Sequence, residues 1–566
     1  MPSMAAPGSQ QRWLLSLLLG AILLLSLTPS LRLLVEALSD LGLGNEAPLW
    51  RVLSSSRTWL ALWHSVYTSV LGMLIALLLG GLFAFAITLT DVRGKGMLMF
   101  CFMLPMMIPP QVTALSWLQL FGPASPLLNS LGVAPALGSP QPLHSGEGIA
   151  LLLGIQSAPL VFLALRTSLV ALPRELVEAA RISGARPFQV WWHTVLPLTR
   201  GGLVAGGAMA FVSNLGNFGI PAMLGIPAGY HVLPTLIYQR MAGFGTGVLA
   251  EMAVLSMLIG GLALAGVALQ QRLMKRSRFG LIGHVGRAHD LSLGRWRGWV
   301  EAGLAALLAV LLVAPLLALV VGSLVPAMGV PLTIESATLE AYREMLGRQG
   351  VTRRALHNSL WLAGGAALTL MAVSLPLAYR LLRLPRRWQG LALGAIELPY
   401  ALPGVVLAVA CILLFVRPLP LVEVTLYGTL GLIFIAYLAR FLMVGLKPVT
   451  ASLAQLDPSL EEAAQLAGAG LWRRLSGIVL PLMAPALFAG GLLVFLIAVN
   501  ELTVSALLWS AGNETLGVLV YTLDQGGDSV LASAVAVLVV AVVALMMLAL
   551  SLLASRLPRG VIPWRN

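Results

Sequence analysis

The pattern with the clearest chemical meaning is a Glu-Ala-Ala triplet, followed by a glycine and a Leu-Pro pair, which occurs twice. The copies lie 284 residues apart, and their members are Glu178, Ala179, Ala180, Gly184 and Pro197, and Glu462, Ala463, Ala464, Gly468 and Pro481. The glycines allow a backbone turn with positive φ, and the alanines leave room for the surface of another protein. No His-Glu-x-x-His, Gly-x-Ser-x-Gly or paired-cysteine motif accompanies them. The pattern therefore predicts a duplicated docking element and no catalytic site.

The residues around each triplet predict the element that presents it. Both copies begin with a proline and carboxylates, at 173–175 and 457–462, and these residue types are favoured in the first turn of a helix. Each short helix is expected to break at the glycine, and a second helix is expected to end near the Leu-Pro pair. Ordinary interfacial amphipathic helices are the alternative. Because both copies have the same spacing of 19 residues from glutamate to proline, we favour helix–turn–helix docking elements at 173–197 and 457–481.

This pattern resembles the EAA signature of permease subunits in binding-protein-dependent ATP-binding-cassette (ABC) importers. The resemblance covers nearly the whole chain and implies the type I importer permease fold, with five core helices and one leading helix in each half. It also implies that each EAA helix inserts into a groove on a separate ATPase subunit and transmits closure of the ATPase dimer. The implied partners are two copies of a cytoplasmic ABC ATPase, which bind ATP and Mg, and a periplasmic solute-binding protein. No cofactor is implied for this chain itself.

The composition predicts the setting of these elements. Of the 566 residues, 58% are hydrophobic and only 10% are charged, which is typical of an integral membrane protein. Twelve apolar runs are long enough to cross the bilayer, and we predict an all-α polytopic protein with two parallel six-helix repeats. The runs are 14–34, 61–89, 97–120, 149–172, 198–215, 249–269, 299–321, 360–382, 391–416, 426–446, 482–499 and 530–553.

The basic residues predict the orientation. Most of the 35 Lys and Arg residues fall on one side of the predicted topology, and the loop 270–297 is especially basic, whereas segments 121–148 and 501–528 hold none. By the positive-inside rule, the loop and both termini are expected in the cytoplasm of a bacterial cell, with the chain in its inner membrane. A nucleic-acid partner is not expected, because no basic face interleaved with aromatic residues occurs on a soluble domain.

A second alignment joins the two halves. Residues 104–109 match residues 398–403 at an offset of 294, and the halves follow each other in the same orientation. We expect an N-terminal repeat at 1–280 and a C-terminal repeat at 281–566. Because each repeat has an even number of spans, both EAA elements should reach the same side of the membrane.

Two further sets of residues are candidates for the translocation path. Prolines inside the third run of each half, Pro105, Pro109, Pro399 and Pro403, should kink or end the helices, and a pathway can bend at such breaks. Asn217 and Glu501 occupy matching positions at the 284-residue offset, near the expected pseudo-twofold axis, where they could meet the cargo. Helix capping or a contact with the binding protein is the alternative role.

Several functions are disfavoured by what the chain lacks. No Walker A sequence occurs, so hydrolysis of ATP is expected only in separate subunits. Cys101 and Cys411 lie inside apolar runs, which favours packing over a disulfide or a metal site. A secondary transporter, the rival interpretation, is expected to use intramembrane ionisable residues, and the spans contain almost none.

Two segments and the fusion of the halves bear on the cargo. The fusion of the halves and the segments 217–221 and 501–503 are most similar to ferric-iron permeases and to their thiamine and aminoalkylphosphonate relatives. We therefore expect ferric iron as cargo. Thiamine, an aminoalkylphosphonate or a polyamine remain open, because selectivity in this importer class resides largely in the binding protein.

Overall fold

The computed structural model describes residues 9–39, 44, 46–136, 138–243, 247–276, 291–418, 423 and 425–553. Throughout these ranges the regular elements are helices, and the only β contact is an isolated bridge between Thr90 and Leu291. Ten of the described helices are long and apolar enough to cross a membrane, or twelve if two bent helix pairs are each counted as one span. The predicted all-α polytopic class is confirmed. The boundary between 280 and 281 lies outside the described residues.

The helices of the first half are α1 (Ser9–Ala37), α2 (Pro48–Ser54), α3 (Ser56–Leu89), α4 (Lys95–Met107), α5 (Pro110–Leu120), α6 (Pro126–Ser130), α7 (Gly146–Val170), α8 (Arg174–Ile182), α9 (Pro187–Val190), α10 (Leu196–Leu215), α11 (Gly219–Gly225), α12 (Leu233–Met241) and α13 (Val248–Arg276). Those of the second half are α14 (Arg297–Leu308), α15 (Ala314–Ser323), α16 (Glu340–Arg343), α17 (Gly350–Leu381), α18 (Arg386–Ala401), α19 (Gly404–Phe415), α20 (Leu430–Leu453), α21 (Pro458–Leu466), α22 (Leu471–Arg474), α23 (Leu480–Val499), α24 (Ser505–Leu508), α25 (Leu516–Gln525) and α26 (Ser529–Leu553).

Each half is built around a bundle of three long helices. Helices α3, α7 and α10 pack together in the first half, and α17, α20 and α23 do so in the second. Glycines allow close approach of the backbones: a Cβ at Gly80 of α3 would lie 2.5 Å from the carbonyl oxygen of Ala158 in α7. A Cβ at Gly490 of α23 would lie 2.7 Å from the carbonyl oxygen of Gly445 in α20. The two bundles are therefore assembled in the same way.

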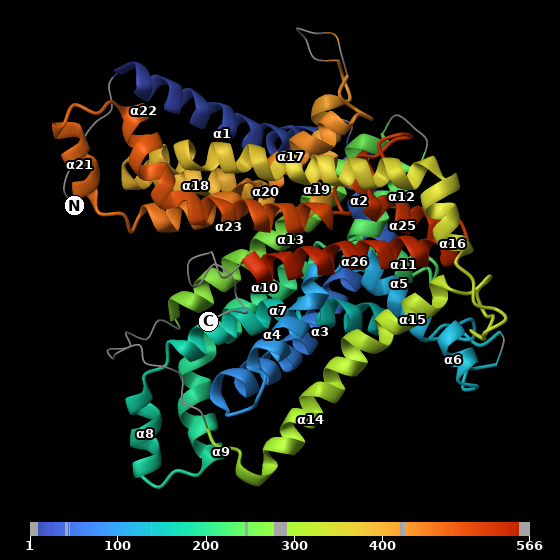
Figure 1. Cartoon of the computed structure of the whole chain (residues 1–566). Coiled ribbons are helices and arrows are strands. Elements are labelled where there is room, and N and C mark those ends of the chain that lie inside the picture. The colour runs from blue at the N-terminus through green and yellow to red at the C-terminus, as the bar shows by residue number, and fades with distance from the viewer. Residues whose placement is uncertain are drawn as a thin grey trace.

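The leading helices are exchanged between the halves. Helix α1 packs on α17, α18 and α19 of the second half, and the continuous helix formed by α14 and α15 packs on α4 and α5 of the first half (Figure 1). Further contacts between the halves are made by α13 with α19 and by α26 with α5. This exchange explains how two homologous halves form one body.

The predicted breaks are present at Pro109 and Pro403, whereas Pro105 and Pro399 lie inside helices, and the breaks bend the chain more sharply than a kinked single span would. Helices α4 and α5 meet at an angle of 102°, and α18 and α19 meet at 101°. Pro109 and Pro403 lie at the breaks, directly before α5 and α19. Since proline has no backbone N–H and fixes φ, each break occurs where an unbroken helix could not continue. The runs 97–120 and 391–416 are therefore bent pairs and not straight spans.

A second difference concerns Pro197 and Pro481, which were expected near helix ends. Each proline instead lies at the start of a long helix, α10 or α23, that continues without interruption from the preceding π-helical turn at Trp191–Val195 or Leu475–Val479. The N–H of Leu196 bonds to the carbonyl of Trp191, five residues back, and Leu480 bonds in the same way to Leu475. This wider turn accommodates the proline within the helix. The expectation of a helix end at these positions was wrong.

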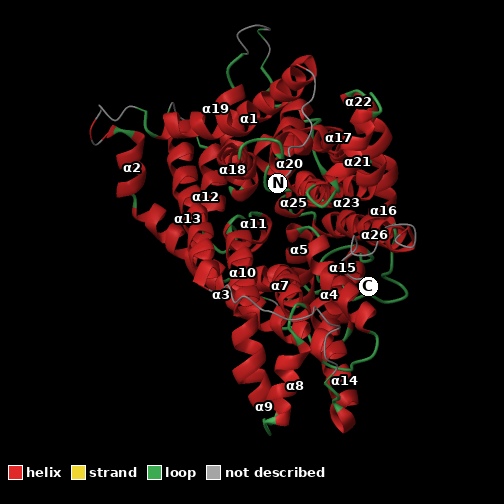
Figure 2. Ribbon diagram, turned by 90° about the vertical axis from the view of Figure 1, so that its left-hand side faces the viewer, coloured by secondary structure: helices red, strands yellow, loops and turns green. Residues whose placement is uncertain are grey.

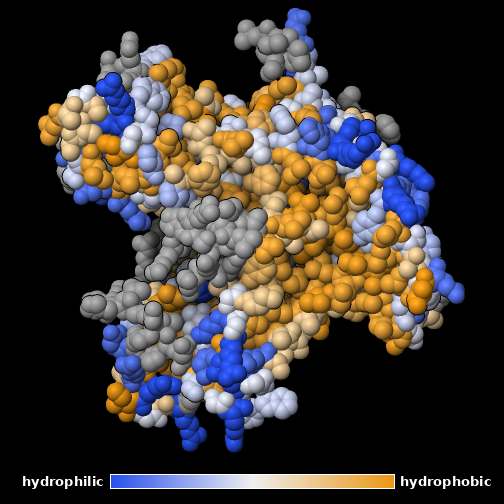
Figure 3. All heavy atoms as spheres, viewed as in Figure 1, coloured by the Kyte–Doolittle hydropathy of each residue, from blue (hydrophilic) through white to orange (hydrophobic). Residues whose placement is uncertain are grey.

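The surface is that of a multi-pass membrane protein. Apolar side chains form a broad band over the middle of the molecule, and hydrophilic groups gather toward its two ends (Figure 3). Helices α8 and α21 lie at one of these ends, in separate lobes (Figures 1 and 2). We call this the EAA end. The expectation that both EAA elements reach the same side is confirmed.

Candidate docking elements and translocation seam

The two EAA elements have the same backbone geometry. Helix α8 is followed by Gly184 with φ of +84°, and α21 is followed by Gly468 with φ of +77°. The N–H of Ala185 bonds to the carbonyl of Ala180 at 3.1 Å, and the N–H of Ala469 bonds to that of Ala464 at 2.9 Å. Both turns are therefore glycine-terminated helix ends in which only glycine avoids strain. No other described atom lies within 4 Å of the position of a Cβ on either glycine, so this space is open to a partner.

The predicted docking residues lie at or near the surface of these elements. Ala179 and Ala463 are exposed, while Ala180, Ala464 and Glu462 are half-buried. Glu178 is exposed as well. Of the two glutamates predicted to dock, Glu178 is thus exposed and Glu462 is partly accessible to another protein.

Large apolar side chains extend the same surface, and the sequence analysis missed them. They form two apolar triads whose members match at the 284-residue offset: Leu176, Ile182 and Phe188 in the first half, and Leu460, Leu466 and Trp472 in the second. Ile182 is 88% exposed and Leu466 is 91% exposed. Exposed apolar groups at an end rich in charged residues are typical of a protein interface. The recurrence of apolar residues at the offset already found was the signal in the sequence.

Helix α21 is anchored to the body by a buried ionic network around Glu461. The carboxylate of Glu461 accepts hydrogen bonds from the hydroxyl of Tyr379 at 2.7 Å and from Nη2 of Arg383 at 2.9 Å. Arg474 lies 3.9 Å from the same oxygen and donates to Gln465 at 3.2 Å. Burial lowers the pKa of the Arg383 guanidinium. This network holds the second docking element against the end of α17.

The start of α21 carries its own cap. Asp457 accepts a hydrogen bond from the N–H of Ser459 at 2.9 Å, and this bond is the main reason that the pKa of Asp457 lies below its ordinary value. Helix α21 begins at Pro458, where the proline and the carboxylates predicted a helix start. The sequence analysis picked Glu462 for docking, but it did not distinguish this glutamate from its buried neighbour Glu461.

The first docking element is anchored by apolar side chains at the same positions. Val177 and Val190 replace Glu461 and Arg474 at the 284-residue offset, and both valines are buried. Phe85 and Leu89 replace Tyr379 and Arg383 at the 294-residue offset, and the ring of Phe85 packs edge-on against Trp191 with centroids 5.5 Å apart. The two elements thus share their shape but differ in what holds them.

The ends of the bundle helices meet the breaks of the opposite half. The amide of Asn500, after α23, donates to the carbonyl of Met107 at 2.6 Å, where α4 ends. Its counterpart Gly216, after α10, approaches Pro403 so closely that a Cβ would lie 3.4 Å from Cα. We call this region, where each half touches the break of the other, the seam. Pro109 and Pro403 lie on it, and Pro105 and Pro399 lie inside α4 and α18 before the breaks.

Asn217 and Glu501 accept equivalent backbone hydrogen bonds just before the short helices α11 and α24. The side-chain oxygen of Asn217 accepts from the N–H of Ile220 at 3.2 Å, and that of Glu501 accepts from the N–H of Val504 at 2.9 Å. The bonds are equivalent, because both donors and both acceptors are displaced by 284 residues. Each bond holds the turn that leads into the helix, whereas the N-cap residues themselves, Phe218 and Val504, make no side-chain capping bond. A role in contacting cargo remains a prediction.

A charged residue that the sequence analysis did not single out lies beside Glu501. Nε of Arg440 is 3.4 Å from the Glu501 carboxylate, and Arg440 lies in the middle of α20. The matching position in α7 is Gln156, which accepts from Thr113 at 3.0 Å and donates to the carbonyl of Ile108 at 3.0 Å. A single arginine within the apolar run 426–446 was the available signal, and it qualifies the expectation of almost no intramembrane charge.

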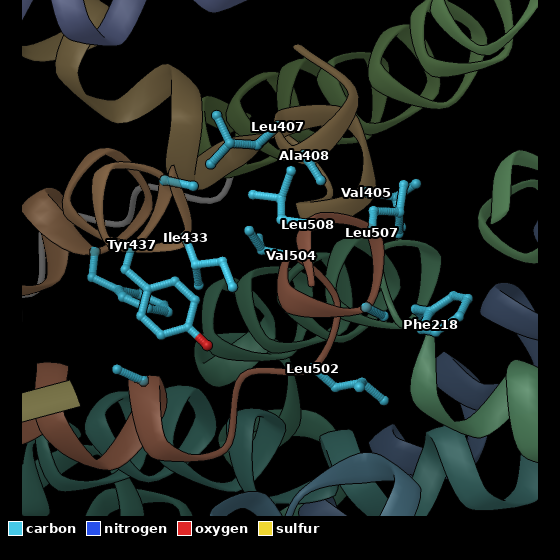
Figure 4. Close-up of a cluster of buried hydrophobic side chains, with 14 of the residues drawn as sticks. Phe218, Val405, Leu407, Ala408, Ile433, Tyr437, Leu502, Val504, Leu507 and Leu508 are labelled. Carbon is cyan, nitrogen blue, oxygen red and sulfur yellow. The ribbon is translucent and has the colours of Figure 1, made fainter. Parts of the chain in front are cut away.

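The hydrophobic core closes around these residues in the second half. Leu502, Val504, Leu507 and Leu508 pack with Val405, Leu407 and Ala408 of α19, and with Ile433 and Tyr437 of α20 (Figure 4). The hydroxyl of Tyr437 donates to the backbone carbonyl of Glu501 at 3.3 Å. The segment that carries Glu501 is thus held on both its backbone and its side chain. Among the described residues no cluster of three His, Cys, Asp or Glu residues could hold a metal ion.

Comparison with known proteins decides the family. The model of the inner membrane component of binding-protein-dependent transport systems matches residues 76–276 and 370–563, one segment in each half. The chain belongs to this family. It is a permease subunit of an ABC importer and not an enzyme. The matched segments contain both EAA elements, α8 to α10 and α21 to α23.

Individual relatives of this ABC permease are distant. A probable ABC transporter permease protein, y4fN, of Sinorhizobium fredii is 28% identical over 97% of both chains. The putative ferric transport system permease protein FbpB 1 of Haemophilus influenzae is 27% identical and covers 87% of this chain and 77% of its own. The molybdenum permease ModB of Escherichia coli is 30% identical over 32% of this chain and 78% of its own. A crystal structure of a bacterial ABC transporter involved in alginate import aligns over 46% of this chain at 17% identity, with a TM-score of 0.38.

Proposed function

We propose that this permease is the translocating subunit of an ATP-driven importer in the bacterial inner membrane, and that α8 and α21 each dock one copy of a cytoplasmic ABC ATPase. The main support is the pair of matching helix–turn–helix elements with their exposed apolar triads. In this proposal ATP and Mg bind to the ATPases, and the permease chain carries no cofactor. A periplasmic solute-binding protein delivers the cargo to the opposite end.

The geometry supports alternating access as the mechanism. At the EAA end the docking elements lie in separate lobes, and away from it the halves meet at the seam (Figures 1 and 2). When two ATPases close on ATP, they draw α8 and α21 toward each other. Because each element is anchored to its bundle by a buried cluster, the bundles turn with it, and the seam opens to the periplasm. The termini are cytoplasmic in this arrangement, although their last residues lie outside the described ranges.

For the cargo, ferric iron is our first proposal. Two relatives whose names assign them to ferric transport match 87% and 76% of the chain, at 27% and 28% identity. Molybdate is the second candidate, because the molybdenum permease ModB matches at 30% identity and because the positively charged Arg440 favours an anion. Thiamine, aminoalkylphosphonates and polyamines are the remaining alternatives, and a proton- or sodium-driven secondary transporter is the alternative mechanism.

The test is uptake into proteoliposomes that contain the permease, its ATPase and its binding protein. Radiolabelled iron, molybdate, thiamine, an aminoalkylphosphonate and a polyamine are supplied outside the vesicles, one at a time. The ATPases face the lumen, which is loaded with ATP or left without it. The proposal predicts uptake of iron that requires both ATP and the binding protein. Uptake that is driven by an ion gradient and is indifferent to ATP would contradict it, and ATP-dependent uptake of another solute would replace iron as the cargo.

A further inference from the structure

Arg440 is a charge in the middle of a membrane-spanning helix. It is the eleventh of the 24 residues of α20. A charged side chain at this depth costs at least about 2.5–3.5 kcal/mol, so arginine is rare there and normally has a function. Its side chain is 18% exposed, and the carboxylate of Glu501 lies 3.4 Å away. We therefore expect Arg440 to have a function beyond its pairing with Glu501.

The pair with Glu501 leaves the guanidinium incompletely satisfied. One oxygen of Glu501 is occupied by the N–H of Val504, and only the other faces Nε of Arg440. Nη1 of Arg440 is buried and has no hydrogen-bond partner in the described part of the chain. This nitrogen points to the break between α18 and α19, because a Cβ on Gly404 would lie 2.9 Å from it. An unsatisfied donor next to a break in the helix is available to a ligand.

A second unsatisfied group lies on the seam. Gln111, at the start of α5, is completely buried, and neither its amide nitrogen nor its amide oxygen has a partner among the described residues. Its side chain lies between the halves: a Cβ on Gly219 would lie 3.3 Å from the amide oxygen, and one on Gly517 would lie 2.9 Å from the amide nitrogen. The same Gly517 position is 3.5 Å from the carbonyl oxygen of Glu501. Gln111 and the Glu501 segment thus border the same part of the seam.

The first half shows that the fold itself does not require this charge pair. Gln156 and Asn217 occupy the positions of Arg440 and Glu501 there. Both are neutral, and each makes the hydrogen bonds described above. An amide pair therefore supports the same helix and the same backbone hydrogen bond. The charges in the second half are an addition that packing does not explain.

We propose that Arg440 and Gln111 form a transient binding site for a cargo that presents anionic oxygen atoms, with Glu501 as the counter-ion of Arg440 when no cargo is present. Guanidinium groups bind carboxylates and oxyanions through charge-assisted hydrogen bonds. When the seam parts, cargo oxygen replaces Glu501 at Arg440, and Glu501 remains bonded to Val504. The cargo is then an oxyanion such as molybdate, or a ferric ion that is still coordinated by an oxygen anion. A bare ferric ion would be repelled by Arg440.

This inference rests on the proposed importer function, and its test uses the complete importer in proteoliposomes. The variant Arg440→Gln with Glu501→Asn gives the second half the amide pair of the first half. The matched control is Lys447→Gln with Glu397→Gln, which removes an ion pair of 2.7 Å between the same helix, α20, and α18, where both side chains are about half exposed. Uptake of labelled molybdate and of labelled ferric citrate is measured, together with ATP hydrolysis stimulated by the binding protein.

We expect uptake by the amide-pair variant to fall about tenfold or more, as the loss of one charge-assisted hydrogen bond implies. Stimulated ATP hydrolysis and the melting temperature should stay at the wild-type level, and the control should transport within about twofold of wild type. The cargo that wild type takes up distinguishes the two sources of anionic oxygen. Uptake of molybdate alone would support the site while it refutes iron as the cargo.

The opposite results separate the two proposals. If wild type imports iron with ATP and the amide-pair variant imports it equally well, the importer function stands and the anion site is wrong. If Arg440→Gln alone increases uptake of ferric citrate above the wild-type level, Arg440 repels the cargo and the site is also wrong. If wild type imports neither of these probes nor the aminoalkylphosphonate, both the cargo proposal and the anion site are overturned.

Discussion

At the residue scale, the glycines after α8 and α21 carry the shape of the docking elements. Gly184 and Gly468 have φ of +84° and +77°, a region in which other residues are strained by about 1–2 kcal/mol. The space beside each is open within the described chain, so a side chain there would meet a partner and not the permease itself. A substitution that adds only a methyl group should therefore have a small effect on docking, and one that adds a long side chain should have a large effect.

The prediction is that Gly184→Arg or Gly468→Arg leaves the permease inserted and folded but abolishes stimulated ATP hydrolysis. Gly184→Ala and Gly468→Ala are the matched controls, because they add the backbone strain without a long side chain, and they should retain most of the activity. The yield of inserted protein and the ATPase rate of the assembled importer are measured. Normal hydrolysis with arginine at both positions would show that neither turn faces an ATPase.

The sequence predicted the docking residues better than it predicted the residues that hold them. The recurrence at 284 residues identified Glu462, but the burial of its neighbour Glu461 depends on the end of α17, which is distant in the sequence, as well as on the adjacent α22. Arg440 was missed for a related reason, since a single charge hardly changes the apolar character of its run. Asn217 and Glu501 were found as a pair, but the sequence does not reveal the backbone N–H groups from which they accept hydrogen bonds.

At the element scale, the two docking helices are fixed by different physical means. A buried ionic network holds α21, and an apolar cluster at the same positions holds α8. Burying charges costs desolvation energy, and such a pair is often no more stabilising than apolar side chains of similar size. Removing one partner of such a pair lowers stability, because the remaining charge stays buried without a counter-ion.

The corresponding prediction compares one substitution with a complete exchange. Glu461→Val leaves Arg474 and Arg383 without their carboxylate, and we expect a loss of about 3–5 kcal/mol in stability. The combination Tyr379→Phe, Arg383→Leu, Glu461→Val and Arg474→Val copies the first half and should recover most of that loss. Thermal unfolding of the purified permease in detergent measures both. A combined variant as unstable as Glu461→Val would mean that the two anchors are not interchangeable.

The elements were predicted well where the cause is local. Proline breaks follow from the chemistry of Pro109 and Pro403 and were expected. The continuation of α10 and α23 past Pro197 and Pro481 was not, because the π-helical turn that admits each proline has no simple signature in the sequence. The exchange of α1 and α14 between the halves was also beyond the sequence, since apolar runs reveal that helices pack but not with which partner.

At the scale of the whole molecule, the account depends on the orientation of the chain. Both docking elements lie at one end, and the positive-inside rule assigns that end to the cytoplasm. Gln271 lies near the end of α13 and Gln525 at the end of α25, and both are exposed. These two positions therefore report the two sides of the membrane.

We predict that Gln271→Cys reacts with a membrane-impermeant thiol reagent only from the cytoplasm, and that Gln525→Cys reacts only from outside. The background carries Cys101→Ala and Cys411→Ala, which removes the two native cysteines. Labelling is compared in whole cells and in inverted vesicles. Reaction of both cysteines from the same side would refute the proposed topology.

The central claim is that one permease chain docks two ATPase copies through α8 and α21, and native mass spectrometry of the purified importer tests it most directly. The account predicts a complex of one permease and two ATPases for wild type. Ile182→Asp combined with Leu466→Asp should yield permease without ATPase, because a charge replaces the most exposed apolar residue of each triad. Ile334→Asp, at a fully exposed isoleucine outside both EAA elements, should retain two. Two ATPases bound to the double variant, or one bound to wild type, would contradict the claim.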